Sequence, residues 1–437
     1  MDGLEAEVED IVQPTPERSQ RIVLFGLFGV NNLGNDATLD VALFHLRKRL
    51  PGAEVLCVAH KLSQVAAASG VTLLPMDPLP IRGAWRIRST LLRQAYIGVA
   101  TMATEPLRMW RVAQLLRRDD LVVILGTGVL DDFGASFWDL PAWLLRWCWA
   151  AKTRGAALQF VAVGAGPIVS PLNRLLMTRA VRLADHRSYR DTVSKQYLER
   201  IGVDTERDRV VPDLVFSLPQ EWLPVGRPAQ SRPTTIAVGL MGYFGWDGDR
   251  KKGRSLYESY ISKMTRFVSW LLEQGYRVRL MVGELGTDEP AVRDVCAGIA
   301  ARCNGALHPM LSANPIESLE GVLREIAGSD AVIATRFHNV ICALTLGRPV
   351  IAIGYSNKFD ALMREMDLES YCQHIEALDV DGMITQFQAL ATNYMPMKEA
   401  ILSTTQRYRE ELDELYDTLC RELFAGERSS RGEAEGW

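Results

Sequence analysis

The sequence repeats one local pattern, a short and uniformly apolar run that ends in glycine. Leu121–Leu125 has no polar alternation, which is typical of a strand buried on both faces, and it leads into Gly126-Thr127-Gly128. Leu158–Val163 repeats the pattern before two further glycines. Near the N-terminus, Arg21–Gly26 is followed by a helical pattern and then by a second expected strand at Glu54–Ala59. Strands separated by helices predict a parallel sheet covered by helices on both faces.

A segment rich in Pro, Gly, Arg and Ser, Glu221–Pro233, separates two such series and is predicted to be a linker. In the second half we expect strands at Thr235–Met241, Arg277–Val282, Ala331–Ala334 and Val350–Ile353. A chain of 437 residues also fits two domains better than one. We therefore expect an α/β fold of two Rossmann-like parallel-sheet domains that face each other across a cleft, the GT-B-like plan. Ligands of such sheets bind at the carboxyl ends of the strands.

These patterns also predict the limits of each part of the chain. The expected parts are a disordered N-terminal tail (1–20), an N-terminal α/β domain (21–218), a linker (219–233), a C-terminal α/β domain (234–384), C-terminal helices (385–425) and a disordered C-terminal tail (426–437). The last part is mostly glycine and polar residues, a composition that cannot bury a core.

Composition excludes several classes of function. The net charge of −4 gives no reason to expect nucleic-acid binding. The seven cysteines are scattered without a C-x-x-C pair, so neither a zinc site nor a disulfide framework is predicted, and we expect no metal and no cofactor. The N-terminus lacks the pattern of a secretory signal, and no apolar run approaches the roughly 20 residues that span a bilayer. These features favour a cytoplasmic enzyme.

The first candidate site segment, Gly26–Asp36, follows the first expected strand. Glycines at this point permit close approach of the backbone to a ligand, and the N-terminus of the next helix attracts anions. The segment is not G-x-G-x-x-G, so a dinucleotide-binding fingerprint is absent. It is equally consistent with a tight turn whose Asn and Asp side chains cap the helix.

Basic side chains follow two later strands. Arg336 and His338 come directly after a buried strand, and we expect both to point to the same side of an extended segment. An arginine can bind a carboxylate or phosphate, and a histidine can carry a proton near pH 7. Lys358 follows the next strand, and Arg190 directly precedes a predicted helix. Together these cations favour an anionic ligand, although each is also consistent with a structural ion pair or a solvated loop.

Six segments, in order along the chain, resemble the motifs of the polysaccharide pyruvyl transferase family. The matching residues are Gly29, Asn32, Gly34, Asn35 and Asp36 for a G-x-x-N-x-G-D-E stretch, Gly126-Thr127-Gly128 for a G-G-G turn, Arg190, Asp191 and Ser194 for R-D-x-x-S, Asp213–Phe216 for D-P-x-F, Arg336 and His338 for R-x-H-A, and Gly354–Lys358 for S-Y-x-x-K. Three sites depart from the family pattern: Asn35-Asp36 replaces an Asp-Glu pair, Thr127 replaces a glycine, and Asn339 replaces a small residue.

The resemblance implies a reaction in which the enolpyruvyl carbons of phosphoenolpyruvate move to a sugar as a cyclic ketal and phosphate is released. The sugar belongs to a polysaccharide or a lipid-linked saccharide. The roles implied are His338 as general acid, Arg190 and Lys358 as cations that bind the anionic donor, and Arg336 as a supporting donor contact. Further donor contacts are expected from Tyr355, Ser356, Gly126 and Gly128, and donor or acceptor contacts from Gly29, Asn32, Gly34, Asn35 and Asp36.

One stretch indicates contact with a membrane surface. Between Ile81 and Arg118 lie the arginines Arg82, Arg86, Arg88, Arg93, Arg108, Arg111, Arg117 and Arg118, with Trp85 and Trp110 among them and Trp138, Trp143, Trp147 and Trp149 soon after. Basic residues mixed with large apolar ones suit an anionic lipid surface, such as the inner face of a membrane. A solvated basic face beside a tryptophan-rich core helix explains the pattern equally well.

Two other functions remain open from the sequence. The first is a GT-B glycosyltransferase with a nucleotide-sugar donor, which requires an acidic residue in the second half to hold the ribose; Glu284 and Asp288 are candidates. The second is a non-catalytic binding protein that keeps the fold, which the departures at Asn35-Asp36 and Thr127 would favour.

Overall fold

The computed structural model describes residues 20–59, 71–79, 89–132, 136–226, 230–245 and 250–432. The expected N-terminal tail therefore lies almost entirely outside the described residues. The N-terminal domain holds a sheet of seven parallel strands in the order β3-β2-β1-β4-β5-β6-β7. The strands are β1 (Arg21–Phe25), β2 (Glu54–Ala59), β3 (Thr72–Pro75), β4 (Asp120–Leu125), β5 (Ala157–Val163), β6 (His186–Tyr189) and β7 (Arg209–Val210). The helices of this domain are α1 (Leu33–Arg49), α3 (Thr90–Leu115), α4 (Leu140–Arg154), α5 (Pro171–Arg182) and α6 (Thr192–Arg200), followed by the short 3-10 helices η2 (Leu214–Ser217) and η3 (Gln220–Trp222).

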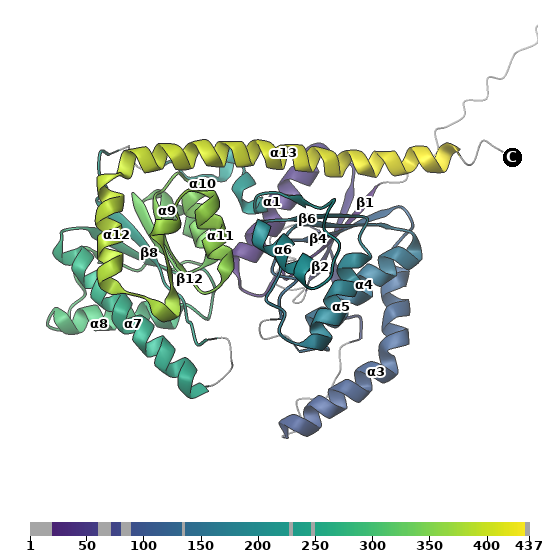
Figure 1. The fold of residues 1–437 in the computed structure, drawn as a ribbon, viewed down its shortest axis with the longest axis horizontal. Coiled ribbons are helices and arrows are strands. Elements are labelled where there is room, and N and C mark those ends of the chain that lie inside the picture. Colours follow the sequence, from purple (N-terminus) through teal and green to yellow (C-terminus); the bar gives the residue numbers. More distant parts are fainter. Residues whose placement is uncertain are drawn as a thin grey trace, which may run out of the picture.

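The C-terminal domain repeats this plan with a parallel sheet of six strands in the order β10-β9-β8-β11-β12-β13. The strands are β8 (Thr235–Gly239), β9 (Arg277–Met281), β10 (Leu311–Ser312), β11 (Ala331–Ala334), β12 (Val350–Gly354) and β13 (Cys372–His374). The helices are α7 (Arg250–Glu273), α8 (Glu289–Arg302), α9 (Leu319–Ala327), α10 (Phe337–Thr345), α11 (Asn357–Glu365), α12 (Val380–Thr392) and α13 (Tyr394–Gly432), with 3-10 helices η4 (Glu369–Tyr371) and η5 (Ile375–Ala377). The expected α/β fold with two Rossmann-like parallel sheets is confirmed (Figure 1).

Both sheets have a point at which the chain reverses its direction of winding. The first domain runs outward from β1 through β2 to β3 and then returns to place β4 on the other side of β1. The second domain does the same with β8 and β11. Ligands of open parallel sheets bind outside the carboxyl ends of the strands at this point. The fold thus predicts a site near the segments that follow β1, β4, β8 and β11.

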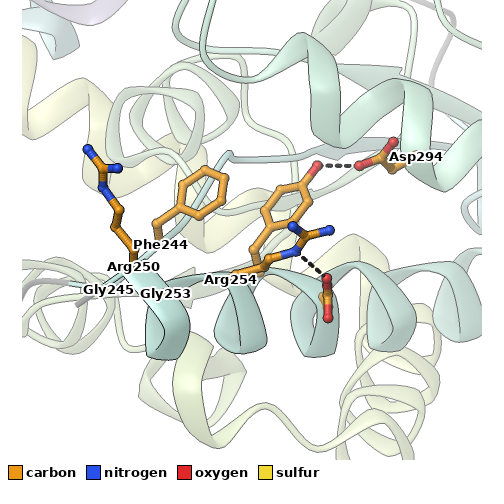
Figure 2. A pocket seen from close by; sticks show the side chains of 8 residues that line it. Phe244, Gly245, Arg250, Gly253, Arg254 and Asp294 are labelled. Carbon is orange, nitrogen blue, oxygen red and sulfur yellow. Dashed lines mark hydrogen bonds and ion pairs between the residues drawn. The ribbon is translucent and has the colours of Figure 1, made fainter. Parts of the chain in front are cut away.

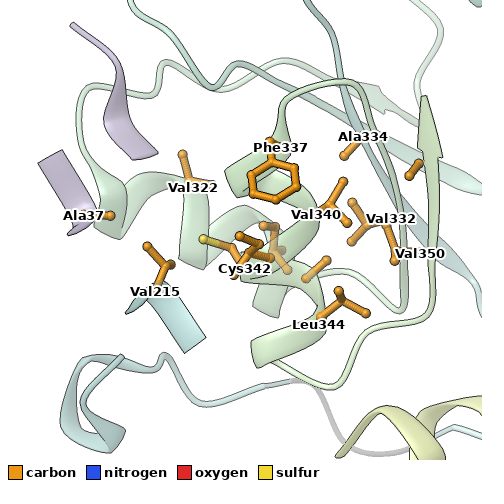
Figure 3. Close-up of a cluster of buried hydrophobic side chains, with 14 of the residues drawn as sticks. Ala37, Val215, Val322, Val332, Ala334, Phe337, Val340, Cys342, Leu344 and Val350 are labelled. Atoms are coloured by element: carbon orange, nitrogen blue, oxygen red, sulfur yellow. The ribbon is translucent and has the colours of Figure 1, made fainter. Parts of the chain in front are cut away.

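The two domains share a hydrophobic core on the side of α1. One continuous cluster of buried side chains includes Ala37 of α1, Val215 of η2, Val322 of α9 and Cys342 of α10, which Figure 3 shows together. These side chains come from both domains and exclude water between them. The burial of apolar surface therefore fixes the relative position of the two sheets.

Helix α13 also joins the domains, because it crosses the second domain and then the first (Figure 1). Arg49 at the end of α1 binds Asp413 and Asp417 of α13 at 2.9 and 2.6 Å. Tyr416 of α13 stacks on His45, with ring centroids 4.5 Å apart. The helix continues to Gly432, past the point at 426 where we expected the chain to lose structure.

Candidate active site

The segment between β1 and α1 is shaped by its own hydrogen bonds. Asn32 caps α1, since its side chain accepts from the backbone N–H groups of Gly34 and Asn35 at 3.1 and 3.2 Å. The Asn35 amide donates to the Leu27 carbonyl at 3.2 Å. The capping interpretation of this segment is therefore confirmed for Asn32, while Asn35 fixes the loop that precedes the helix.

The acidic member of this motif lies at the other side of the same loop. The backbone N–H of Gly29, a residue with a φ of 68°, donates to Asp36 Oδ1 at 3.0 Å. Burial raises the pKa of Asp36, and this hydrogen bond partly offsets the rise. The side chain of Asp36 thus holds the turn that brings the Gly29 backbone toward α1.

The turn after β4 supports the loop after β1. Thr127 Oγ1 accepts from the Leu27 N–H at 2.8 Å, so the threonine that departs from the family's glycine joins the two segments. A Cβ added at Gly126 would lie 2.0 Å from the Ala162 carbonyl oxygen, which leaves Gly126 no space beside β5. Gly128 has a φ of 73°, a conformation that favours glycine. Close packing of neighbouring backbones accounts for Gly126, which we expected to contact a donor.

The loop after β1 meets the second domain directly. Asn31 accepts the Leu285 N–H at 2.9 Å through its carbonyl, and the Leu33 N–H donates to the Gly283 carbonyl at 3.3 Å. A Cβ added at Gly34 would lie 2.0 Å from Nδ1 of His338, so the imidazole packs against the backbone of α1. The carboxyl ends of β1, β9 and β11 therefore converge, as the expected arrangement of facing domains requires.

The expectation that Arg336 and His338 share one side of an extended segment is wrong. Helix α10 begins at Phe337, with Arg336 as its extended N-cap, and the helical turn separates the two side chains. Arg336 binds Asp288 through two hydrogen bonds of 2.6 and 3.0 Å and pairs with Glu284 at 2.7 Å. Its guanidinium is thus occupied by two carboxylates within the second domain.

Those two carboxylates are the residues that a nucleotide-sugar site would have used for ribose. Asp288 is fully buried and also accepts the backbone N–H groups of Gly242, Gly283 and Glu284 at 2.9 to 3.1 Å. Its oxygen atoms are therefore saturated by this chain. Asp288 braces the segments that follow β8 and β9 against Arg336 at the N-cap of α10.

Arg190 and Lys358 approach each other across the domain boundary. The guanidinium carbon of Arg190, after β6, lies 4.7 Å from the centre of the Phe337 ring, and Lys358 Nζ, in the first turn of α11, lies 5.2 Å from it. Lys358 also lies 5.0 Å from the centre of the Tyr355 ring. Arg190 NH1 donates to Asp213 at 3.3 Å, whereas no carboxylate among the described residues pairs with Lys358. One cation from each domain therefore lies beside the same phenyl ring, and Asp191 and Asp213 accompany Arg190.

Several buried polar atoms of this region lack a hydrogen-bond partner among the described residues. They are Arg190 Nε and Asp191 Oδ2, which face each other as an ion pair at 3.7 Å, and His338 Nε2 and Ser356 Oγ. An unpaired buried polar atom costs about 1–3 kcal/mol, and most native proteins contain few of them. His338 Nε2 and Ser356 Oγ, close in sequence to the ring of Phe337 and to Lys358, are the two atoms of this group that a polar ligand would complete.

The charge state of His338 depends on these neighbours. Burial lowers the pKa of His338 to about 4; the carboxylate of Asp213 opposes this change, and the cations Arg190 and Lys358 add to it. The imidazole is therefore neutral at pH 7 in the absence of ligand. An anion bound between the two cations would raise the pKa of His338 again.

A narrow cavity beside these cations is lined from both domains and from α13. Its walls include Arg190, Asp213, Phe337, Lys358, Glu365 and Tyr408. Burial raises the pKa of Glu365 to about 7, the charge of Asp191 adds to the rise, and the Thr192 N–H opposes it. Asp213 lies in the matched D-P-x-F segment, but no sequence signal pointed to Phe337 or Glu365.

A second, open groove of about 640 Å³ lies at the start of α7 (Figure 2). Phe244 is half-exposed and stacks on Tyr257, with ring centroids 4.8 Å apart and planes 10° apart. The Tyr257 hydroxyl donates to Asp294 at 2.6 Å, and Arg254 pairs with Glu258 at 2.8 Å. Because Phe244 follows β8, this aromatic surface lies at the carboxyl-end side of the second sheet.

Two parallel sheets whose carboxyl ends meet at one site define the GT-B class of fold. Solved structures with this fold resemble the chain over most of its length. A putative UDP-N-acetylglucosamine 2-epimerase from Listeria monocytogenes matches with a TM-score of 0.56 and 13% identity, over 92% of this chain and 97% of the other. A trehalose 6-phosphate synthase from Burkholderia multivorans matches with a TM-score of 0.54 and 13% identity, over 96% and 99%. At these identities the likeness concerns the fold alone.

Sequence comparison then gives the family. The model of the polysaccharide pyruvyl transferase family matches residues 32–357, and the chain belongs to this family. The amylovoran biosynthesis protein AmsJ of Erwinia amylovora is 22% identical over 236 residues. That match covers 50% of this chain and 54% of AmsJ, so the chain spans about half the length of this relative.

Proposed function

We propose that the protein transfers the three enolpyruvyl carbons of phosphoenolpyruvate to two hydroxyl groups of a saccharide, forming a cyclic ketal and releasing phosphate. Family membership supports this class of reaction. The observation that carries the proposal for this site is the approach of Arg190 and Lys358 from different domains to the Phe337 ring, together with the buried His338 Nε2 and Ser356 Oγ, which have no hydrogen-bond partner among the described residues. The donor has a carboxylate and a phosphate, which need two fixed cations and several hydrogen-bond donors.

The proposed role of His338 is to deliver the proton that activates the donor. Phosphoenolpyruvate brings negative charge between Arg190 and Lys358 and thereby raises the pKa of the imidazole from its low value in the empty site. His338 then gives its proton to the methylene carbon, which makes the neighbouring C2 electrophilic. A neutral histidine before donor binding and a protonated one after it would restrict this chemistry to the loaded site.

The remaining steps balance around C2. One sugar hydroxyl adds to C2 and loses its proton, the bond from C2 to the phosphate oxygen breaks, and a second hydroxyl adds and loses its proton. Neutral His338 accepts the proton of one hydroxyl and the departing phosphate takes up the other, while Arg190 and Lys358 stabilise that phosphate. The net result is one ketal and one phosphate from one donor and one diol.

Arg336 enters this proposal as a positioning residue and no longer as a donor contact. Its ion pairs with Asp288 and Glu284 hold the N-terminus of α10, the helix that carries His338. We place the acceptor near Phe244, because an exposed aromatic ring in an open groove at the carboxyl-end side of the second sheet suits contact with a pyranose.

The nucleotide-sugar alternative loses the feature on which it depended, because Glu284 and Asp288 are engaged by Arg336. The experiment that tests the proposal measures phosphate release from phosphoenolpyruvate with a panel of saccharide acceptors, together with the mass of the product. A pyruvylated saccharide is the expected product. Transfer of a sugar from a nucleotide donor, with no reaction of phosphoenolpyruvate, would support the alternative. Absence of both reactions, with normal binding of saccharide, would favour a non-catalytic binding protein.

A further inference from the structure

Helix α3 exposes a stripe of large apolar side chains. The exposed residues are Leu92, Tyr96, Val99, Met102, Leu107 and Trp110, with exposed fractions between 44% and 70%. Leu92, Tyr96 and Val99 follow helical spacing and lie on one face, and Trp110 returns to the same face about five turns after Leu92. A contiguous apolar surface of this kind marks an interaction site, because the exposure of apolar side chains to water is energetically unfavourable.

The charges of α3 are arranged around this stripe. The one acidic residue of the helix, Glu105, is engaged by Arg146 in two hydrogen bonds of 2.8 Å. Arg108 is buried and binds Asp77. Arg93 and Arg111 are the arginines of α3 that remain exposed, and the described residues supply no ion pair for either. Since they are also about five turns apart, they flank the stripe on the same side.

Helix α3 projects away from the body of the first domain (Figure 1). Its C-terminal part packs against α4, while the part that begins at Thr90 extends beyond the neighbouring elements. Leu92, near the start of the helix, is 66% exposed, and Val99, two turns later, is 70% exposed. The stripe is therefore presented at an extremity of the molecule, where a flat surface can reach it.

We propose that this face of α3 docks on an anionic membrane surface. The apolar stripe enters the boundary between headgroups and acyl chains, and Arg93 and Arg111 bind lipid phosphates beside it. A helix with an apolar face, basic flanks and no unpaired acid matches the pattern of helices that lie in a membrane interface. A second copy of the chain is a poorer occupant, because pairing two such faces would bring arginines of like charge together.

This surface differs from the one that the arginine pattern alone predicted. Arg108 is buried, Trp147 belongs to the core of the first domain, and Arg82, Arg86 and Arg88 lie outside the described residues. The apolar stripe, which the sequence analysis did not single out, now provides the main contact. Among the described residues, no helix combines the length and the apolar character that a bilayer span requires.

The test uses the full chain and sedimentation with vesicles of phosphatidylcholine, with or without phosphatidylglycerol. The wild type is expected to bind the phosphatidylglycerol vesicles more tightly, and salt should weaken the binding. A variant with Leu92→Ser, Val99→Ser and Met102→Ser should bind at least tenfold more weakly. Arg93→Gln with Arg111→Gln should remove most of the salt dependence. Leu307→Ser, at an exposed leucine of the second domain, is the matched control and should bind like the wild type.

Thermal melts of all variants establish that these exposed substitutions leave the fold intact. The docking proposal is overturned if the wild type ignores the vesicles, or if the serine variant binds them as the wild type does. It is also overturned if the lipid-free wild type is a dimer that the serine variant converts to a monomer while neither binds vesicles. The proposal needs no transferase reaction. Equal phosphate release by wild type and serine variant with a water-soluble acceptor would separate docking from catalysis.

Discussion

The two sheet domains make different contributions to the site, although the first six strands of each sheet are arranged in the same order. The motif residues of the first domain mostly make hydrogen bonds to backbone: Asn32 caps α1, Asn35 binds the Leu27 carbonyl, and Thr127 binds the Leu27 N–H. In the second domain, the first turns of α10 and α11 present His338 and Lys358 to the site. The first domain forms a shaped wall, with Arg190 as its cation, and the second supplies the proposed general acid.

This difference explains why departures from the family pattern need not abolish activity. Thr127 replaces a glycine, yet its hydroxyl strengthens the loop by accepting the Leu27 N–H. Asn339 replaces a small residue, and its side-chain amide donates to the Val282 carbonyl at 3.4 Å. Both side chains act on backbone near the site. The non-catalytic interpretation relied on Thr127 and on Asn35-Asp36, and each of these side chains forms a hydrogen bond to backbone of the loop after β1.

The largest effect is expected from the second domain. His338→Ala should reduce turnover by roughly 10² to 10⁴, because the donor loses its general acid. Affinity for phosphoenolpyruvate should change much less, since proton transfer acts in the transition state. Phosphate release measures turnover and calorimetry measures affinity. Near-normal turnover in a folded His338→Ala protein would mean that another group is the general acid. Glu365 would then be the next candidate.

The next largest effect, a loss of donor affinity, is expected when the cation of either domain is removed. Lys358→Ala and Arg190→Ala should each weaken phosphoenolpyruvate binding about tenfold to a hundredfold, because each removes a charge-assisted hydrogen bond. Arg250 is exposed in the open groove at the start of α7, so Arg250→Ala is the control and should leave donor affinity unchanged. Calorimetric titration of the three variants checks this. If both site variants bind the donor normally, phosphoenolpyruvate does not lie between these cations.

A substitution at Gly34, in the first domain, should change turnover by displacing His338 of the second domain. Gly34→Ala would place a methyl group on the imidazole of His338, 2.0 Å from Nδ1 before any adjustment. We expect turnover to fall about tenfold as the ring is displaced, since catalytic groups tolerate little misplacement. Gly52→Ala is the matched control, because a Cβ there meets no atom within 4 Å. In a His338→Ala background, Gly34→Ala should have no further effect; an independent loss would show that the two residues act separately.

A substitution in the open groove at the start of α7 should affect the KM of the acceptor alone. Phe244→Ala removes the exposed ring of the stacked pair and should raise the acceptor KM about threefold to tenfold, the size expected for one aromatic contact. Donor affinity should stay unchanged. Leu307→Ala, an exposed apolar side chain elsewhere on the second domain, serves as control. Steady-state kinetics with a fixed, saturating donor concentration measures the change. An unchanged acceptor KM would remove Phe244 from the acceptor site.

The sequence predicted the centre of each sheet well and its edges poorly. The expected strands at Leu121–Leu125 and Ala331–Ala334 correspond to β4 and β11, because strands covered on both faces are uniformly apolar. The outer strands β10 and β13 have two and three residues, too few for any period to be recognised. Strand β6 is polar in sequence, and the hydroxyl of its Ser188 accepts the Ala162 N–H of β5 at 3.0 Å in addition to the backbone pairing. Short strands are specified by their neighbours in space.

The candidate site shows the same contrast. The sequence singled out Arg336, His338 and Lys358 because each follows an expected strand and the carboxyl ends of parallel strands converge, whereas Arg190 came from its place before a predicted helix and from the family resemblance. The engagement of Arg336 by Asp288 was not foreseen, since the two residues are 48 positions apart and no local pattern links them. Phe337 has an apolar side chain and gave no chemical signal, yet its ring lies next to both cations. Sequence order locates strand ends, whereas the partner of each charge depends on packing.

The smallest expected effect concerns protons taken up when the donor binds. The pKa of free His338 is about 4, below its ordinary value of 6.5, so the ring is neutral at pH 6. A bound anion raises this pKa, and binding at pH 6 should therefore take up as much as one proton. Calorimetry in buffers of different ionisation enthalpy measures the uptake. His338→Gln is the control, because subtracting its value removes the contribution of the donor's own phosphate. An equal uptake in both proteins would mean that His338 stays neutral in the complex and does not act as the acid. A larger uptake in the wild type would instead show that His338, in the second domain, becomes protonated when the anionic donor binds.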